Sequence, residues 1–188
     1  MTTSPRGPGR PRAISREMLA EAAGELFLER GYDATSIADI ARRAGIGRSS
    51  FFNYAATKAD LLWGEFDERL SRAERAIDAG AGPDEAMRLI VDGFVPDALA
   101  LAIANAQAMR IEASLEQESA LRAWRTAVLA SRALRRGGAA EAAADVRGGA
   151  YGAALLTAVR AWACAPPGPG SLSDHLEEAL AAVADIGR

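Results

Sequence analysis

The chain has 188 residues and a formal net charge of −3, and alanine is its most frequent residue. Alanine favours helices, whereas aromatic residues, which favour strands, make up only 6% of the chain, so we expect an all-α fold. The single cysteine, Cys164, excludes a disulfide framework and a thiolate metal cage. The single histidine, His175, excludes multi-histidine metal sites and argues against a Ser-His-Asp triad.

The sequence isolates no paired acid and base and no activated nucleophile, so we expect neither an enzyme nor a metal or other cofactor. No apolar run approaches the roughly 18 to 20 residues that would span a bilayer. The basic N-terminal segment has no apolar stretch behind it and does not resemble a secretory signal. We therefore expect a cytoplasmic protein without membrane association.

Residues 1–12 form a basic arm that we expect to be disordered, with Arg6, Arg10 and Arg12 among prolines and glycines. Two interpretations stay open for it: a solvated tail, or an arm that contacts a polyanion. Residues 1–60 carry nine basic and seven acidic side chains, and the rest carry thirteen and eighteen, so the positive charge is concentrated at the start.

Capping residues predict three helices and the start of a fourth within the first 62 residues. Ser15 begins a helix that ends at Gly31, and Ser36, with Asp39 three residues on, begins a shorter one that ends at Gly45. A third short helix follows Gly47, and Thr57 with Asp60 begins a long one.

Five further helices are expected, which gives about nine in all. Gly and Pro residues separate them, above all in the loop at 166–170. Their expected ranges are about 84–95, 97–114, 116–136, 139–163 and from 173 onward.

The second and third helices, joined by a glycine-containing turn, are typical of a helix-turn-helix, whose second helix enters the major groove of DNA. If Phe51 faces the core, the residues around it face outward and can donate hydrogen bonds to bases or phosphates. Lys58, at the start of the next helix, adds a cation for phosphate. The alternative is an ordinary polar surface helix. The outward residues are Arg48, Ser49, Ser50 and Asn53.

The stretches 25–32, 35–45, 50–54 and 57–62 together resemble the DNA-binding domain of TetR-family repressors over about residues 13–62. The resemblance implies a homodimer of all-α subunits, each with a three-helix head and a larger helical domain for ligand binding and dimerisation. It places these domains at residues 13–60 and 61–188.

Carried over by position, the resemblance implies that Thr35 and Ser36 reach phosphate from the start of the second helix. Ser50 matches the family's common Thr, Tyr54 its His or Tyr phosphate contact, and Lys58 its Lys. Two residues depart from the family pattern. Phe52 replaces a frequent Tyr and lacks its hydroxyl, and Ala55 replaces an aromatic residue that packs the head against the long helix.

Residues 63–67 and 121–125 resemble a subgroup of these regulators with an acyl-CoA-like ligand domain, which includes mycofactocin-system regulators. A pocket in a helical domain needs an apolar lining and a few polar anchors. Each candidate has the alternative of being plain core or surface. The candidate ligand-binding residues are Met87, Phe94, Asn105, Met109, Arg110, Trp124, Arg125 and Tyr151.

The last two helices are expected to form the homodimer as a two-fold, four-helix interface. Small residues would let the partner helix approach closely, and larger apolar residues would form the seam. The small residues are Gly148, Gly149, Gly152, Ala153 and Ala154, and the seam residues are Leu155, Val159, Leu176, Leu180 and Val183.

The sequence therefore predicts a ligand-responsive regulator, a repressor, that binds a palindromic double-stranded DNA operator and a small hydrophobic effector, with acyl-CoA as a candidate. The alternative is a small-molecule or acyl-CoA binding module with weak or vestigial DNA binding, which the two departures from the family pattern keep open.

Overall fold

The computed structural model describes residues 14–166 and 170–185, which contain ten α-helices and no strand. The predicted arm at 1–12 lies outside the described residues. The first three helices form a small head: α1 (Arg16–Arg30), α2 (Ile37–Arg43) and α3 (Arg48–Phe51). The remaining helices form a larger body, and α4 crosses the predicted domain boundary at residue 60.

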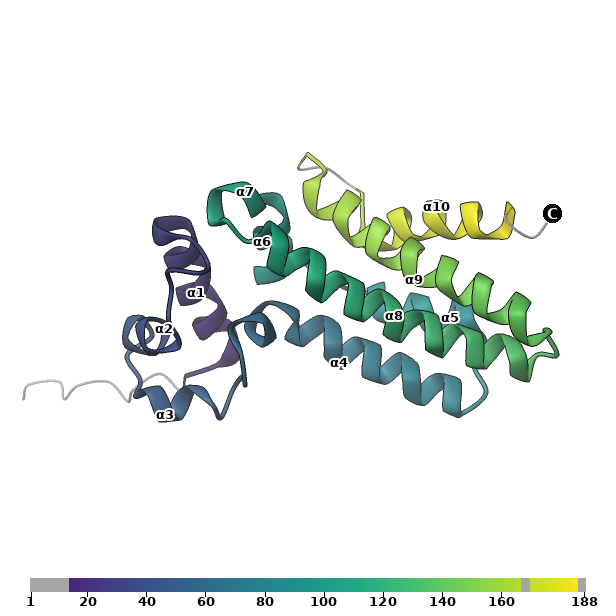
Figure 1. Ribbon diagram of the computed structural model, residues 1–188, viewed down its shortest axis with the longest axis horizontal. Helices are drawn as coiled ribbons and strands as arrows, with labels where there is room; N and C mark the ends of the chain where they lie inside the picture. The colour runs from purple at the N-terminus through teal and green to yellow at the C-terminus, as the bar shows by residue number, and fades with distance from the viewer. Residues whose placement is uncertain (1–13, 167–169, 186–188) are drawn as a thin grey trace, which may run out of the picture.

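The body consists of one long helix that leaves the head and six helices that pack on it or on one another. In Figure 1 the head lies at one end, α4 runs along the body beneath α8, and α8 and α9 lie side by side as a long antiparallel pair, with α10 against α9. The body helices are α4 (Lys58–Asp78), α5 (Pro83–Val91), α6 (Ala98–Ala104), α7 (Ala106–Met109), α8 (Glu112–Arg136), α9 (Glu141–Cys164) and α10 (Leu172–Asp185).

The helix starts follow the predicted caps. The side chains of Ser15, Ser36 and Thr57 each accept a backbone N–H in the first turn of their helix. Asp39 and Asp60 complete capping boxes with Ser36 and Thr57, and the Ser36 hydrogen bonds hold the pKa of Asp39 below its ordinary value. The three predicted helix starts are therefore confirmed.

The helix expected over 97–114 is instead divided into α6, α7 and the first turn of α8. The first of the two breaks falls at Asn105, and the second falls at Arg110, which adopts a left-handed backbone with φ +52°. Ordinary residues adopt this conformation only where the surroundings hold it. Here the aliphatic part of Arg110 packs against Gly31, and the neighbouring Met109 carbonyl accepts the Tyr32 N–H at 2.8 Å. Contact with the head thus breaks this helix.

A second contact fixes the head to α4. The Arg16 guanidinium lies where a side chain at Gly64 would be, since a Cβ built there would fall 1.9 Å from Arg16 Cζ. The same guanidinium donates to the Asp60 carbonyl and lies 3.5 Å from the Glu68 carboxylate. Because Gly64 has no side chain, Arg16 of α1 can pack directly against α4 at this position.

The apolar residues that were expected to form a seam between two subunits instead pack within a single chain. Leu155 and Leu176 are fully buried, and Val159, Leu180 and Val183 are nearly so, because α10 packs on α9 of its own chain. This packing corrects the expected position of a dimer interface built from these five residues. The small residues divide, because Gly148, Gly152 and Ala154 are buried, whereas Gly149 and Ala153 are exposed.

Within residues 14–166 and 170–185, no helix is both long and apolar enough to cross a bilayer. The same part of the chain contains no cluster of His, Cys, Asp and Glu side chains suited to a metal ion.

Candidate nucleic-acid interface

The turn between α2 and α3 sets the position of α3. Gly45 has φ +74°, a backbone conformation that glycine adopts without strain. The Ile46 N–H then donates to the Ala41 carbonyl at 2.9 Å, and Gly47 begins α3. Phe51 is fully buried and anchors the helix to the head. As a result α3 lies at the edge of the head, with one side turned away from the other described helices (Figure 1).

The outward side of α3 and the turn that follows it carry five of the eight predicted DNA-binding residues. Arg48, Ser49 and Asn53 are exposed, and Ser50 and Tyr54 are half-buried. Phe52 is 50% exposed and packs edge-on against the buried Phe51 ring. The surface that the sequence predicted is therefore present and uncovered within the described chain.

Arg48 differs electrostatically from the other cations of the head. Arg43 is held by Glu25 at 2.8 Å and by Glu29 at 2.7 Å, and Arg42 pairs with Asp39. Arg48, in contrast, makes neither an ion pair nor a side-chain hydrogen bond with any described residue. It is therefore the head cation whose guanidinium is most available to a base edge or a phosphate.

Two predicted phosphate-binding residues are turned inward. Thr35 is 1% exposed, and its hydroxyl donates to the Gly31 carbonyl at 2.9 Å and to the Leu26 carbonyl at 3.3 Å. Lys58 Nζ donates to the Tyr32 and Thr35 carbonyls at 2.6 and 2.9 Å and lies 4.0 Å from the Tyr32 ring centre. Both side chains hold the 31–36 loop against α1 and α4 in this conformation. Ser36 is exposed at the start of α2.

Replacing Lys58 by Met is expected to destabilise the fold by about 1–2 kcal/mol, because two carbonyls lose a charged donor. The burial that lowers the pKa of Lys58 offsets part of that gain in the wild type. Chemical denaturation measures the change. Arg75→Met on the same helix is the matched control, because Arg75 is exposed and forms no ion pair with described residues. Equal stability of Lys58→Met and Arg75→Met would contradict the structural role given to Lys58.

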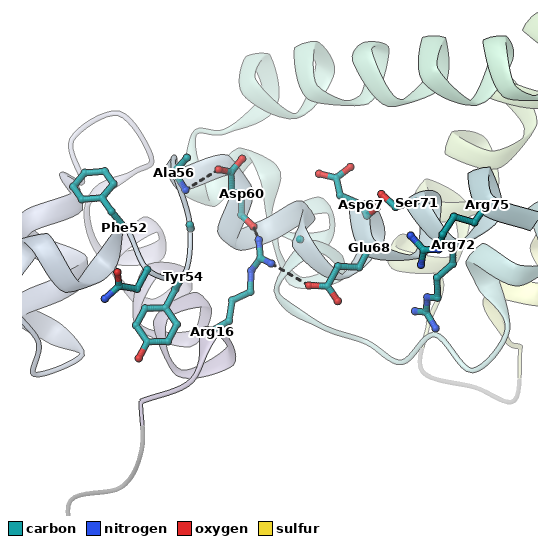
Figure 2. Close-up of a pocket in the computed structure, with 13 residues that line it drawn as sticks. Arg16, Phe52, Tyr54, Ala56, Asp60, Asp67, Glu68, Ser71, Arg72 and Arg75 are labelled. Carbon is teal, nitrogen blue, oxygen red and sulfur yellow. Dashed lines mark hydrogen bonds and ion pairs between the residues drawn. The ribbon is translucent and has the colours of Figure 1, made fainter. Parts of the chain in front are cut away.

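An open polar groove of about 620 Å³ runs from the α3–α4 turn along α4. Figure 2 shows Phe52 and Tyr54 at one end of this groove, Arg72 and Arg75 at the other, and Arg16 between them. Asp60, Asp67 and Glu68 lie along the same groove, so its charges are mixed. The groove begins beside the predicted DNA-binding residues Asn53 and Tyr54 and presents no concentrated positive charge.

The predicted ligand-binding residues do not come together at one cavity. Met87 and Met109 are fully buried core residues, and Phe94 packs edge-on against Trp162. Tyr151 donates to Asp84, and burial raises the pKa of its hydroxyl. The other four lie apart: Asn105 and Arg125 are partly exposed, Arg110 is exposed beside the head, and Trp124 is 69% exposed on α8.

A cavity of about 360 Å³ does lie in the body, where the start of α8 and the end of α9 meet α4, α6 and α7. Its apolar lining includes Trp63, Leu115 and Val159, and Arg160 is an exposed residue of its lining. The sequence did not point to these residues, because the cavity depends on how five helices meet. The sequence does show that Leu115 and Ser119 share one face of a helix, and that Leu156, Val159 and Arg160 share a face of another. This spacing was the signal that could have pointed to the cavity. The other lining residues are Ile103, Ala106, Glu112, Glu116, Ser119, Leu156 and Cys164.

A buried charge network beside the body cavity joins α8 to α4. The Arg122 guanidinium lies 4.3 Å from the Trp63 ring centre and donates to Asp67 on α4 and Glu118 on α8. Arg122 is 4% exposed, so removing either carboxylate would leave a buried charge less well compensated. The packing therefore links α8 to α4, the helix that leaves the head and whose Trp63 forms part of the cavity wall.

A short α2, a glycine turn and an outward α3, supported by α1, define a helix-turn-helix DNA-binding domain. The comparisons give its particular family: residues 19–62 match the model for bacterial regulatory proteins of the tetR family. Residues 19–62 therefore match the DNA-binding domain of TetR-family transcriptional regulators.

Several curated relatives match the chain over its N-terminal part. MftR of Mycobacterium tuberculosis, named as a regulator of mycofactocin biosynthesis, is 37% identical over 70 residues, which are 37% of this chain and 35% of that protein. The repressor ComR of Escherichia coli is 36% identical over 104 residues, 52% of this chain and 44% of that protein. These alignments thus span less than half of each relative.

A solved structure resembles nearly the whole chain. The dihydroxyacetone kinase operon activator DhaS superposes with a TM-score of 0.53 at 15% identity, covering 92% of this chain and 96% of that one. At this identity the likeness supports the all-α architecture of both domains.

Proposed function

We propose that the protein is a ligand-responsive transcriptional repressor that binds a palindromic operator as a homodimer. The observation that carries the proposal is the uncovered outward side of α3, where Arg48 has no intrachain partner among described residues and lies beside the exposed Ser49 and Asn53. Arginine to guanine and asparagine to adenine are the favoured bidentate pairs in the major groove. Phosphate contacts then fall to Ser36, Ser50 and Tyr54, while Thr35 and Lys58 support the loop from inside.

The proposed homodimer uses the outer face of the α8–α9 pair. Trp124 and Val146 are 69% and 66% exposed, and Leu121 and Val128 extend the apolar stripe of α8. On α9 the same face carries the small exposed residues Gly149 and Ala153, and no atom lies within 4 Å of a Cβ built at Gly149. An exposed apolar stripe of this extent on a narrow helix pair suits a two-fold four-helix interface. Such a dimer would present two copies of α3 to successive major grooves, about 34–36 Å apart.

The proposed effector site is the body cavity around Trp63. Its volume of about 360 Å³ suits a small apolar effector, or the acyl part of an acyl-CoA with a phosphate near the exposed Arg160. An effector pressed against Trp63 would act directly on α4, which Arg122 holds to α8, so that α1, which packs on α4 at Gly64, moves with it. Effector and operator would then weaken each other's binding by the same factor.

Selection of bound duplexes from a random library, followed by titration of the selected sequence at several salt concentrations, tests the DNA-binding proposal. We expect a palindromic sequence and an affinity that falls with salt, because phosphate contacts release counterions. Recovery of no sequence at low salt would refute it. Titration of the selected duplex with and without fatty acyl-CoA thioesters and the free fatty acids then tests the effector.

Arg48→Ala is expected to weaken binding to the selected duplex by about 1–3 kcal/mol and to relax discrimination at one symmetric pair of base positions. Arg42→Ala is the matched control, because Arg42 is exposed but is paired with Asp39. Titration against a panel of single-base variants measures both changes. If Arg48→Ala weakened every sequence equally, Arg48 would be a phosphate contact and the base-reading role would be wrong.

The second candidate function is a small-molecule binding module with weak DNA binding. The observation in its favour is that Thr35 and Lys58, two predicted phosphate contacts, are occupied inside the chain, and that Phe52 carries no hydroxyl. Effector affinity that is unchanged by saturating operator DNA would support this candidate over the repressor.

A further inference from the structure

A second cavity, of about 610 Å³, lies where the head meets the body. Its walls come from the first two turns of α1, the first three turns of α4, and the connection from α5 into α6 (Figure 1). We call it the junction groove. It shares no residue with the body cavity around Trp63 and none with the outward side of α3. Its lining is Arg16, Glu17, Ala20, Glu21, Leu61, Leu62, Glu65, Glu68, Val95, Pro96, Asp97, Ala98 and Leu101.

The junction groove leaves apolar side chains facing water. Leu61 and Leu62 are buried in its floor, but Val95 is 68% and Leu101 43% exposed at its edge. A compact apolar body placed between them would remove this surface from water, and burial of such surface is favourable in proportion to its area. The groove thus has the shape and lining of a small-molecule site.

The charges of the junction groove are strongly unbalanced. Glu65 is paired with Arg69 at 2.6 Å, and Glu68 lies 3.5 Å from Arg16. The other three carboxylates, Glu17, Glu21 and Asp97, form no ion pair with any described residue. The groove therefore has an excess of negative charge next to apolar walls, which focus the field of these carboxylates.

Asp97 is the carboxylate set deepest in this groove. One of its oxygens, Oδ1, accepts the N–H groups of Leu99 and Ala100 at 3.0 and 3.1 Å and caps α6. Burial, with a smaller contribution from the charge of Glu65, raises the pKa of Asp97 above its ordinary value. A positive charge in the groove would compensate the buried carboxylate that these surroundings disfavour.

We propose that the junction groove binds an amphipathic cation, a compact apolar molecule with one delocalised positive charge. The apolar body lies between Leu62, Val95 and Leu101, and the charge faces Asp97 and Glu21. Because the walls belong to α1 on one side and to α6 on the other, an occupant holds the head in its present position relative to the body. The site is separate from the proposed effector cavity and does not depend on DNA binding.

The test uses two probes of nearly the same shape and opposite charge, the tetraphenylphosphonium cation and the tetraphenylborate anion. Isothermal titration of the full chain without DNA is expected to show binding of the phosphonium and none of the borate. The double variant Glu21→Gln/Asp97→Asn is expected to bind the phosphonium about tenfold more weakly, because two attractive charges are removed. Asparagine retains the ability to cap α6, so this variant keeps its fold.

Glu116→Gln is the matched control, because Glu116 is an exposed carboxylate that lines the other cavity. We expect it to bind the phosphonium as the wild type does. Loss of binding in this control alone would place the cation in the body cavity, and equal binding of both probes would show an apolar site without charge selectivity. Either result, or no binding of the phosphonium, overturns the proposal. Since no DNA is present, none of them bears on the repressor function.

If the chain also binds its selected operator, the phosphonium is expected to change operator affinity, and the operator to change phosphonium affinity by the same factor. This expectation rests on the proposed function as well as on the site. Independent binding of the two would show that the head keeps one position, and would leave the cation site itself to be judged by the titration without DNA.

Discussion

Trp124→Glu is expected to convert the proposed dimer into a monomer and to weaken binding to the selected operator sequence by roughly 100-fold or more, because one recognition helix then binds alone. Trp124 is 69% exposed in one chain and lies in the middle of the apolar stripe with Leu121 and Val128. Large aromatic residues at the centre of an interface contribute most of its binding energy, and a buried unpaired carboxylate there would add a large cost. Sedimentation velocity and operator titration measure the two effects.

The control for this variant is Leu89→Glu, which changes an apolar residue that is 41% exposed on α5, away from the α8–α9 outer face. We expect it to remain dimeric with unchanged operator affinity. A dimeric Trp124→Glu protein would show that the two subunits meet elsewhere. A monomeric one with wild-type operator affinity would show that dimerisation is not needed for DNA binding.

The head could be predicted from the sequence because its signals are local. Ser36 with Asp39 and Thr57 with Asp60 form capping boxes within four residues of chain, and the turn at Gly45 needs a backbone conformation that glycine favours. Such patterns do not depend on what the rest of the chain does, so the structure follows them closely.

Features that depend on contacts distant in sequence could not be predicted. The left-handed Arg110 is set by packing on Gly31, 79 positions earlier, and no local pattern marks it. Lys58 has a position typical of a phosphate contact, but the loop at 31–36 brings two carbonyls within reach of its ammonium. The apolar side of α9 predicts an interface, yet the sequence does not say that α10 of the same chain covers it.

Gly152 is another residue whose role depends on a contact distant in sequence. Its replacement is expected to have a large effect on stability. A Cβ built on Gly152 would lie 2.3 Å from the Ala123 carbonyl oxygen, a backbone atom of α8 that cannot move without the helix. Gly152→Ala is therefore expected to push α8 and α9 apart and to destabilise the fold by about 3 kcal/mol. For a chain of this size the loss corresponds to a melting temperature lower by about 6–12 °C. Thermal unfolding at equal protein concentrations measures it.

Gly149→Ala, one turn earlier in the same helix, is expected to have the opposite effect on stability. Nothing lies within 4 Å of a Cβ at Gly149, and alanine favours a helix over glycine by about 1 kcal/mol. In the monomeric Trp124→Glu background, Gly149→Ala should therefore stabilise the fold while Gly152→Ala destabilises it. In the dimer the same methyl group at Gly149 enters the proposed interface, so the gain should shrink or reverse. A gain of equal size in both backgrounds would place Gly149 outside the subunit contact, and the outer face of α8 and α9 would then not be the interface.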